Sequence, residues 1–275
     1  MHKSLSDALE IVVKTDPGLV RSHNEDAVFA NPNLGLAILA DGMGGYNAGE
    51  VASGMATTLL SSEIEEGLAL KQAWELEPDA EPYANALLRE RIATANSTIY
   101  HAAQSQPQYS GMGTTLVLAL LADNLLTVAH IGDSRLYRLR GQEFVQITRD
   151  HSLLQEQIDS GMLTPEQAKL SMNKNLVTRA LGVDAAVDAE IRSYPVQAGD
   201  LFLLCSDGLN DMVEDEDIGF TLQTLSANLE LAANQLIQMA NDNGGRDNVS
   251  VILVKVLRDF PAPRGWWSRF QAWLK

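Results

Sequence analysis

The chain has 275 residues and a formal net charge of -16, from 20 lysines and arginines against 36 aspartates and glutamates. Such an acidic protein repels phosphate backbones, so we expect no nucleic acid among its partners. Because 45% of its residues are hydrophobic, the chain can bury a large core and is not a disordered polymer. Its single cysteine, Cys205, cannot form an internal disulfide, which fits a cytoplasmic setting.

We expect neither a secretory leader nor a membrane-spanning helix in this sequence. Residues 1–13 lack a basic region followed by an apolar run, so we expect no signal peptide. The longest apolar stretch, residues 116–122, is far shorter than the ~20 residues that a membrane helix needs.

In chain order, the apolar patterns predict both strands and helices. The first part predicts strands at 11–15, 27–30 and 34–40, then helices at 48–66 and 82–104. Further strands are predicted at 114–121, 125–131, 135–139, 189–194, 201–205 and 249–257, with a helix at 229–241. The middle strands are joined by short turns such as Asp123-Asn124, so they must run antiparallel, which argues against a doubly wound parallel sheet.

Four aspartates share one context, the end of an apolar strand next to glycine. Asp41, Asp133 and Asp207 follow such runs, and Asp247 precedes one. Any one of them alone is best interpreted as a turn residue. If the strand ends meet, however, the carboxylates repel one another and are stable as anions only around cations. Oxygen ligands without paired histidines or cysteines favour Mg²⁺ or Mn²⁺.

Two other interpretations of the glycine-rich segments fail. Gly42-Met43-Gly44-Gly45 lacks the third glycine of a dinucleotide fingerprint and the lysine of a P-loop. No Gly-x-Ser-x-Gly elbow is present, so a serine hydrolase has no visible nucleophile.

Arg21, just ahead of three polar residues, is either a surface ion-pair residue or a ligand for phosphate oxygens.

Taken together, the motifs resemble those of metal-dependent protein phosphatases of type 2C, in particular the bacterial branch. The resemblance covers about residues 10–257. The matching motifs are Arg21-Ser22-His23-Asn24-Glu25-Asp26, Asp41-Gly42-Met43-Gly44-Gly45, Gly111-Met112-Gly113-Thr114-Thr115, Gly132-Asp133-Ser134-Arg135, Ser206-Asp207-Gly208-Leu209 and Gly245-Arg246-Asp247-Asn248-Val249-Ser250. The resemblance implies an α+β fold in which two antiparallel sheets pack as a central sandwich, with helices on both outer faces.

The resemblance also implies roles for individual residues. Asp41 would bridge two divalent cations, Mn²⁺ or Mg²⁺, and the Gly42 carbonyl would bind one of them. Asp207 and Asp247 would hold the other ion, and Asp133 with Asp207 would hold a third, weaker one.

Other residues would act around the ions. Arg21 would bind the substrate phosphate, and Glu25, Asp26 and Asn248 would support the ions, the two carboxylates through metal-bound water. The implied reaction is hydrolysis of phosphoserine or phosphothreonine by a hydroxide that bridges the metals, without a phospho-enzyme.

Two positions depart from the family pattern. Met43 stands where some members carry a histidine that serves as general acid, so the proton for the leaving group must come from metal-bound water or another residue. Tyr46 stands where bacterial relatives often carry histidine, and it is either a packed rim residue or a substrate contact.

We expect a catalytic domain at residues 1–260, with a polar insertion at 150–182 that resembles the family's flap, and a separate tail. The flap would border the site and shape specificity, and its most loop-like part is 171–175. The tail, 261–275, puts Trp266, Phe270, Trp273 and Leu274 on one helical face in a locally basic segment. It either packs on its own domain or docks on a partner or the inner face of the membrane.

Several functions remain in competition. The leading one is a cytoplasmic, monomeric phosphatase that opposes a bacterial serine/threonine kinase and acts on the kinase and its substrates. A phosphatase dedicated to one regulatory phosphoprotein, of the anti-sigma-antagonist type, would share this chemistry. The intact aspartates argue against a phosphoprotein-binding pseudoenzyme, and the net charge of -16 argues against a two-metal nuclease.

Overall fold

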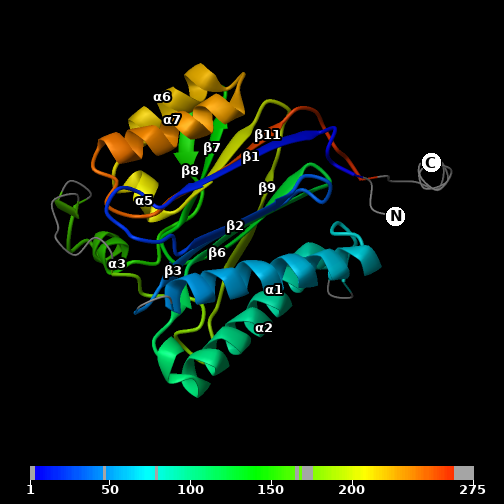
Figure 1. Ribbon diagram of the computed structural model, residues 1–275. Helices are drawn as coiled ribbons and strands as arrows, with labels where there is room; N and C mark the ends of the chain where they lie inside the picture. The colour runs from blue at the N-terminus through cyan, green and yellow to red at the C-terminus, as the bar shows by residue number, and fades with distance from the viewer. Residues whose placement is uncertain (1–3, 46–47, 78–79, 165–166, 169–175, 263–275) are drawn as a thin grey trace.

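The structure is a computed structural model that describes residues 4–45, 48–77, 80–164, 167–168 and 176–262. Two antiparallel sheets pack face to face, with helices on both outer sides (Figure 1). This arrangement confirms the predicted sandwich and the antiparallel strands.

The first sheet has the order β1-β11-β10-β7-β8. Its strands are β1 (Leu9–Asp16), β7 (Arg135–Arg140), β8 (Glu143–Gln146), β10 (Leu201–Cys205) and β11 (Val249–Val256). One face is covered by α5 (Asp207–Asn210), α6 (Asp215–Leu225) and α7 (Leu229–Asp242).

The second sheet has the order β2-β3-β5-β6-β9, and β4 pairs with one end of β3. Its strands are β2 (Asp26–Asn31), β3 (Leu36–Met43), β4 (Gly113–Thr114), β5 (Leu116–Ala122), β6 (Leu125–Ile131) and β9 (Glu190–Pro195). Its outer face carries α1 (Ala48–Leu70) and α2 (Tyr83–Ser105), which leads into η1 (Pro107–Tyr109). The remaining helix, α3 (Leu153–Asp159), lies in the flap.

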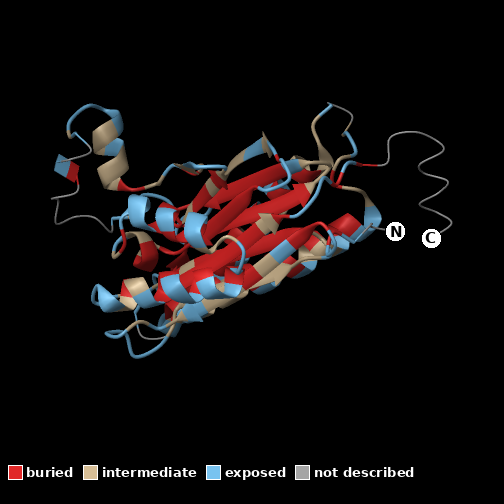
Figure 2. Ribbon diagram, turned by 90° about the horizontal axis from the view of Figure 1, so that it is seen from above, coloured by how far each residue is buried: buried red, intermediate tan, exposed pale blue. Residues whose placement is uncertain are grey.

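Strands at the centre of each sheet are buried on both faces, as Figure 2 shows. In β3, Leu36 and Ile38 pack toward α1 and α2, whereas Ala37 and Leu39 face the other sheet. In β10, Leu203 faces the α7 side and Phe202 the sandwich interior. Alternate side chains of these strands point to opposite faces, and both faces are buried. The strands therefore appear in the sequence as continuous apolar runs.

Three features differ from the sequence-based expectation. β3 continues through Met43, because Gly42 and Met43 pair with β4. β8, α5 and α6 were not predicted, since the first two are very short and α6 carries Gly219 in its interior. Pro82 stands just before α2 rather than inside its first turn.

Candidate metal and phosphate site

The acidic cluster forms at one end of the sandwich, where strands of both sheets begin or end. Asp26 opens β2 and lies opposite Asp41 of β3 in the antiparallel register. Asp133 occupies the turn from β6 to β7, which passes from one sheet to the other. Asp207 is the first residue of α5, directly after β10, and Asp247 precedes β11. The structure therefore brings together all of the predicted aspartates.

Burial, and after it the charge of neighbouring carboxylates, disfavours the anionic form of Asp26, Asp41, Asp133 and Asp207. Burial raises the pKa of Asp41 well above its ordinary value, and the negative charges of Asp26 and Asp207 raise it further. Burial followed by the charge of Asp133 does the same to the pKa of Asp207. The pKa values of Asp26 and Asp133 rise to about 6, in each case mainly through burial.

Two buried carboxylate oxygens in the cluster have no hydrogen-bond partner among the described residues. They are Oδ1 of Asp26 and Oε1 of Glu25, and the latter lies 3.5 Å from His23 Nε2. A buried, unsatisfied anionic oxygen costs free energy, and a divalent cation or its water removes that cost. The donor set is made of oxygen atoms, as Mg²⁺ and Mn²⁺ prefer. The residues present therefore fit divalent cations.

A serine hydroxyl fixes the other oxygen of Asp26. Ser206 is fully buried, and its Oγ donates to Asp26 Oδ2 at 2.8 Å while it accepts from the Ser250 backbone N–H at 3.0 Å. The Ser250 side chain also hydrogen-bonds Asp26, and its Oγ lies 2.7 Å from Thr15 Oγ1. Asn24 donates to Thr15 Oγ1 at 2.7 Å, which continues the chain of donors toward Asp26.

The backbone of Asp41 is held by a second set of hydroxyl groups, which sequence reasoning did not assign. Asp41 N–H donates to Thr115 Oγ1 at 3.0 Å, and the Asp41 carbonyl accepts from Thr115 N at 2.9 Å and from Thr114 Oγ1 at 2.9 Å. Ser134 Oγ lies 2.7 Å from Thr115 Oγ1. Thr114, Thr115 and Ser134 stand inside the motifs quoted above, but the sequence did not show that their hydroxyl groups meet at Asp41.

Asn248 joins two segments at the cluster through three hydrogen bonds. Its Oδ1 accepts from Glu25 N–H at 2.8 Å, and its Nδ2 donates to the carbonyls of Pro17 and His23 at 3.0 Å each. These bonds tie the β1–β2 loop to the start of β11. Asn248 thus orders the segment that carries Glu25 and Asp26.

Two glycines permit close backbone contact at the cluster. A Cβ on Gly42 would lie 2.2 Å from the Gly49 carbonyl oxygen, and one on Gly208 would lie 2.0 Å from the Asn248 carbonyl oxygen. Only glycine fits such approaches. The Gly42 amide also donates to the Glu25 carbonyl at 3.1 Å.

Arg21 is placed beside the carboxylates. Its Nη2 lies 2.7 Å from Asp247 Oδ2, and half of its side chain is exposed. The bond to Asp247 raises the pKa of Arg21 further above its ordinary value, and the charges of Glu25 and Asp207 add to this. A half-exposed guanidinium next to an acidic cluster can reach a phosphate that binds there.

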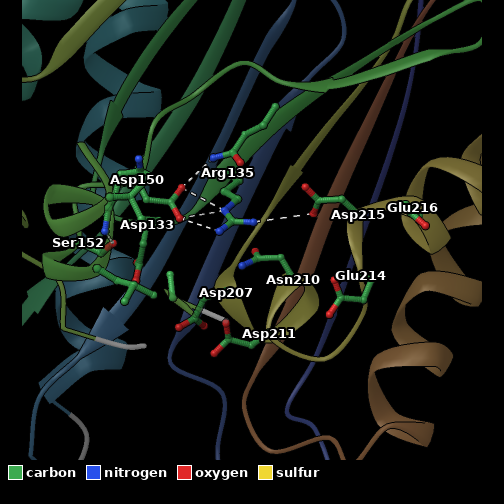
Figure 3. A pocket seen from close by; sticks show the side chains of 15 residues that line it. Asp133, Arg135, Asp150, Ser152, Asp207, Asn210, Asp211, Glu214, Asp215 and Glu216 are labelled. Atoms are coloured by element: carbon green, nitrogen blue, oxygen red, sulfur yellow. Dashed lines mark hydrogen bonds and ion pairs between the residues drawn. The ribbon is translucent and has the colours of Figure 1, made fainter. Parts of the chain in front are cut away.

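The cluster continues into a cavity of about 500 Å³ at the base of the flap (Figure 3). Asp133 and Asp207 line it together with Asp150, which pairs with Arg135 through a shortest contact of 2.7 Å. Figure 3 shows Arg135 between Asp150 and Asp215, with an Arg135–Asp215 separation of 3.8 Å.

Of the two positions that depart from the family pattern, the structure describes only Met43. Met43 ends β3, and its Cε lies 3.0 Å from the position that a Cβ on Gly113 would take. Tyr46, residues 171–175 and Trp266, Phe270, Trp273 and Leu274 lie outside the described residues. In the part of the chain that the structure covers, no helix is both long and apolar enough to span a membrane.

Comparisons with known proteins agree with this fold and site. Residues 20–253 match the family described as protein phosphatase 2C. The serine/threonine phosphatase stp of Listeria welshimeri is 41% identical over 245 residues, which cover 88% of this chain and 94% of the relative.

Solved structures give the same result. The Mycobacterium tuberculosis serine/threonine phosphatase PstP/Ppp superposes with a TM-score of 0.81 at 38% identity, covering 91% of this chain and 100% of that one. The catalytic domain of PstP in complex with two manganese ions gives a TM-score of 0.79 at 39% identity, covering 91% of this chain and 99% of that one.

The four-layer sandwich with acidic residues gathered at one end defines a phosphatase class in which carboxylates, rather than a side-chain nucleophile, dominate the site. The chain belongs to the protein phosphatase 2C family. It is a protein serine/threonine phosphatase, and phosphorylated proteins are its substrates.

Proposed function

We propose that this phosphatase works with two divalent cations, Mn²⁺ or Mg²⁺, and a third, weaker one. Asp41 and the Gly42 carbonyl would hold the first ion, Asp41, Asp207 and Asp247 the second, and Asp133 with Asp207 the third. The observation that carries this proposal is the set of buried, mutually repelling carboxyl groups whose pKa values are raised. The manganese ions bound by the catalytic domain of PstP, a relative of 39% identity, support it.

When bound, the ions would supply Lewis acidity and activate water for attack on phosphorus. Arg21 would hold the oxygens of the phosphate group and orient it for in-line displacement. Glu25 and Asp26 would accept hydrogen bonds from water at the site, since each has a buried oxygen to which no described residue donates a hydrogen bond. Met43 has no proton to give, so the leaving alcohol would take its proton from water or from another residue.

The test is hydrolysis of p-nitrophenyl phosphate and of a phosphothreonine peptide, with Mn²⁺ and with chelator. We expect activity only with the metal, and loss of that activity in Asp207→Asn. Activity that survives in chelator or in this variant would overturn the metal proposal.

We further propose that the enzyme acts in the cytoplasm as a monomer and opposes a serine/threonine kinase. The support is the chemistry itself, because removal of phosphate from serine or threonine has a purpose only where a kinase adds it. Buried Cys205, the single cysteine, fits a reducing compartment. A kinase encoded next to this protein, whose phosphorylated form is a substrate in vitro, would support the pairing, and a kinase product that resists the enzyme would contradict it.

Residues 1–260 form the proposed catalytic domain, and the flap at 150–182 borders the site and shapes substrate choice. The support is that flap residues Ser152 and Gln155 line the same cavity as Asp133 and Asp207. Replacing the flap with that of a relative should change peptide preference, while an unchanged preference would contradict the idea.

For the tail, 261–275, we propose docking on a membrane surface or a partner, because aromatic and basic residues alternate there on an otherwise acidic chain. Co-sedimentation with anionic vesicles, with and without the tail, separates docking from packing on the domain itself. Equal binding of both forms would remove the docking proposal.

A further inference from the structure

A pair of stacked histidines, one buried and one half-buried, lies next to the site without a part in the proposed chemistry. His130 of β6 and His151 at the base of the flap stack their rings, with centroids 4.6 Å apart and planes 17° from parallel. His130 is 2% exposed. Glu190 of β9 lies beside them, with its Oε2 3.9 Å from His151 Nε2.

These three residues have ligand atoms within 4.8 Å of one another, yet the geometry does not suit a metal ion. A metal lies in the plane of each imidazole that binds it, and two nearly parallel stacked planes share no such point. The hydrogen bonds also oppose it. His151 Nδ1 accepts from the Gly132 amide at 3.2 Å, so the neutral ring carries its proton on Nε2, the atom that faces Glu190.

His151 instead joins three segments by hydrogen bonds. It exchanges two bonds with Gly132, because its own amide donates to the Gly132 carbonyl at 2.9 Å while its ring accepts from the Gly132 amide. Its carbonyl accepts from Thr178 N–H at 2.8 Å, at the far end of the flap. Leu153 N–H donates to the Leu176 carbonyl at 2.9 Å and closes the same base.

The segment that His151 holds leads directly to the acidic cluster. Gly132 precedes Asp133 and has a φ of +101°, and a Cβ on Gly132 would lie 2.8 Å from Cβ and Cγ2 of Thr115. Thr115 in turn holds the backbone of Asp41. Figure 3 shows Asp150 and Ser152, the two neighbours of His151, beside Asp133.

His130 supports the ring from the other side. Its Nε2–H donates to the Arg149 carbonyl at 2.8 Å, which fixes its tautomer and holds the chain just before the flap. Burial, and then the neighbouring His130 and Arg179, lower the pKa of His151 to about 4, against smaller opposite effects of Glu190 and Asp150. The ring is therefore neutral near pH 7 and able to accept the Gly132 bond.

We propose that His151 is a positioning residue, whose ring and backbone fasten both ends of the flap to the Gly132–Asp133 turn and so set the position of Asp133 in the cluster. This inference rests on the proposed functions of Asp133 and the flap. One imidazole then links the part of the enzyme that selects substrates to the part that holds the weaker cation.

Two matched variants of the full chain test the ring contact. His151→Asn keeps a side-chain acceptor near the place of Nδ1, whereas His151→Gln moves its amide to the place of Nε2 and loses the Gly132 bond. Both lose the ring stack. Glu190→Gln is the control, because it alters the opposite side of the ring and leaves the Gly132 bond intact.

The first measurement is amide hydrogen exchange without metal, which does not depend on the catalytic mechanism. We expect exchange at the Gly132, Leu153 and Thr178 amides to accelerate roughly tenfold in His151→Gln and to stay near the wild type in His151→Asn and Glu190→Gln. Equal exchange in the Asn and Gln variants would overturn the proposal. So would acceleration in His151→Gln that is uniform over the whole chain.

The second measurement uses the metal-loaded enzyme. In His151→Gln we expect the weaker Mn²⁺ binding measured by calorimetry to lose about fivefold in affinity, and KM for a phosphothreonine peptide to rise by a similar factor. His151→Asn should restore both. Suppose that local exchange differs between the variants as expected, but Mn²⁺ gives no activity. That result would support the positioning role of His151 and refute only the metal proposal.

Discussion

At the scale of single residues, small hydroxyl groups behind the carboxylates decide how the acidic cluster is held. Ser206 uses its one proton for Asp26 and its lone pair for the Ser250 amide. Thr115 does the same kind of work for the backbone of Asp41. Ser206 thereby orients the carboxylate of Asp26, and Thr115 fixes the backbone from which the Asp41 side chain projects.

Replacing Ser206 with alanine tests this support. The change leaves the Ser250 N–H without its acceptor and takes the Ser206 hydroxyl away from Asp26 Oδ2, so we expect the free energy of unfolding to fall by about 1–3 kcal/mol. Mn²⁺ affinity should fall as well, since Asp26 loses its orientation. Denaturant unfolding and calorimetric titration measure the two effects. Ser206→Thr keeps the hydroxyl and should lie closer to the wild type, and an alanine variant with unchanged Mn²⁺ affinity would contradict the role.

Arg21 allows a second test at this scale. Removing its guanidinium in Arg21→Ala should lower kcat/KM for a phosphopeptide by roughly 100-fold, because charge-assisted bonds to the phosphate are lost. Arg21→Lys keeps the charge without the two-pronged geometry and should recover only part of the loss. Steady-state kinetics at saturating Mn²⁺ measure this, and an alanine variant as active as the wild type would exclude Arg21 from phosphate binding.

At the scale of elements, the sequence predicted the strands that long apolar runs specify. It missed the elements whose residues are explained only by contacts with other parts of the chain. β3 and β10 were predictable because both of their faces are buried. α6 was not, because its glycine, Gly219, is explained only by the ring of Phe144, which lies 3.0 Å from where its Cβ would stand. The aspartates were predictable from strand ends, whereas Ser206, Thr115 and His151 became visible only through their partners.

The pair formed by Arg135 and Asp150 fixes β7 to the base of the flap. Both side chains are mostly buried, with 22% and 11% of their surface exposed. Arg135 also donates to Tyr137 at 2.8 Å.

Arg135→Gln leaves a buried carboxylate without its cation, so we expect a loss of roughly 3 kcal/mol in the free energy of unfolding. The control is Arg149→Gln, which breaks an ion pair with Asp159 from a side chain that is 61% exposed. That change should cost less than about 1 kcal/mol. Urea unfolding of the two variants compares them, and equal losses would show that burial does not set the strength of the Arg135 pair.

At the scale of the whole molecule, the acidic cluster makes stability depend on pH in a direction that metal reverses. The pKa values of Asp26 and Asp133 are raised to about 6, and those of Asp41 and Asp207 are raised well above the ordinary value. An unfolded aspartate has a pKa of about 3.9. Between these values the folded, metal-free protein binds more protons than the unfolded chain, so its stability is present at low pH and is lost as pH rises through about 6.

The buried histidines act in the opposite sense. The pKa of His151 is lowered to about 4 and that of His130 is also lowered, so their contribution is present above about 6.5 and is lost as pH falls toward 4. The four raised carboxyl groups outnumber the two histidines. We therefore expect the metal-free protein to melt at a higher temperature at pH 5.5 than at pH 7.5.

Divalent cations need the ionised carboxylates, so protons and metal compete for the same oxygens. Adding Mn²⁺ should raise the melting temperature more at pH 7.5 than at pH 5.5, because metal binds the folded cluster and not the unfolded chain.

Asp207→Asn removes one repelling charge and one ligand together. It should raise the metal-free melting temperature at pH 7.5 and abolish most of the Mn²⁺ effect. Differential scanning calorimetry measures the melting temperature at both pH values, with Mn²⁺ and with chelator. A metal-free protein that becomes more stable from pH 5.5 to 7.5 would show that the carboxylates do not repel one another as the fold implies.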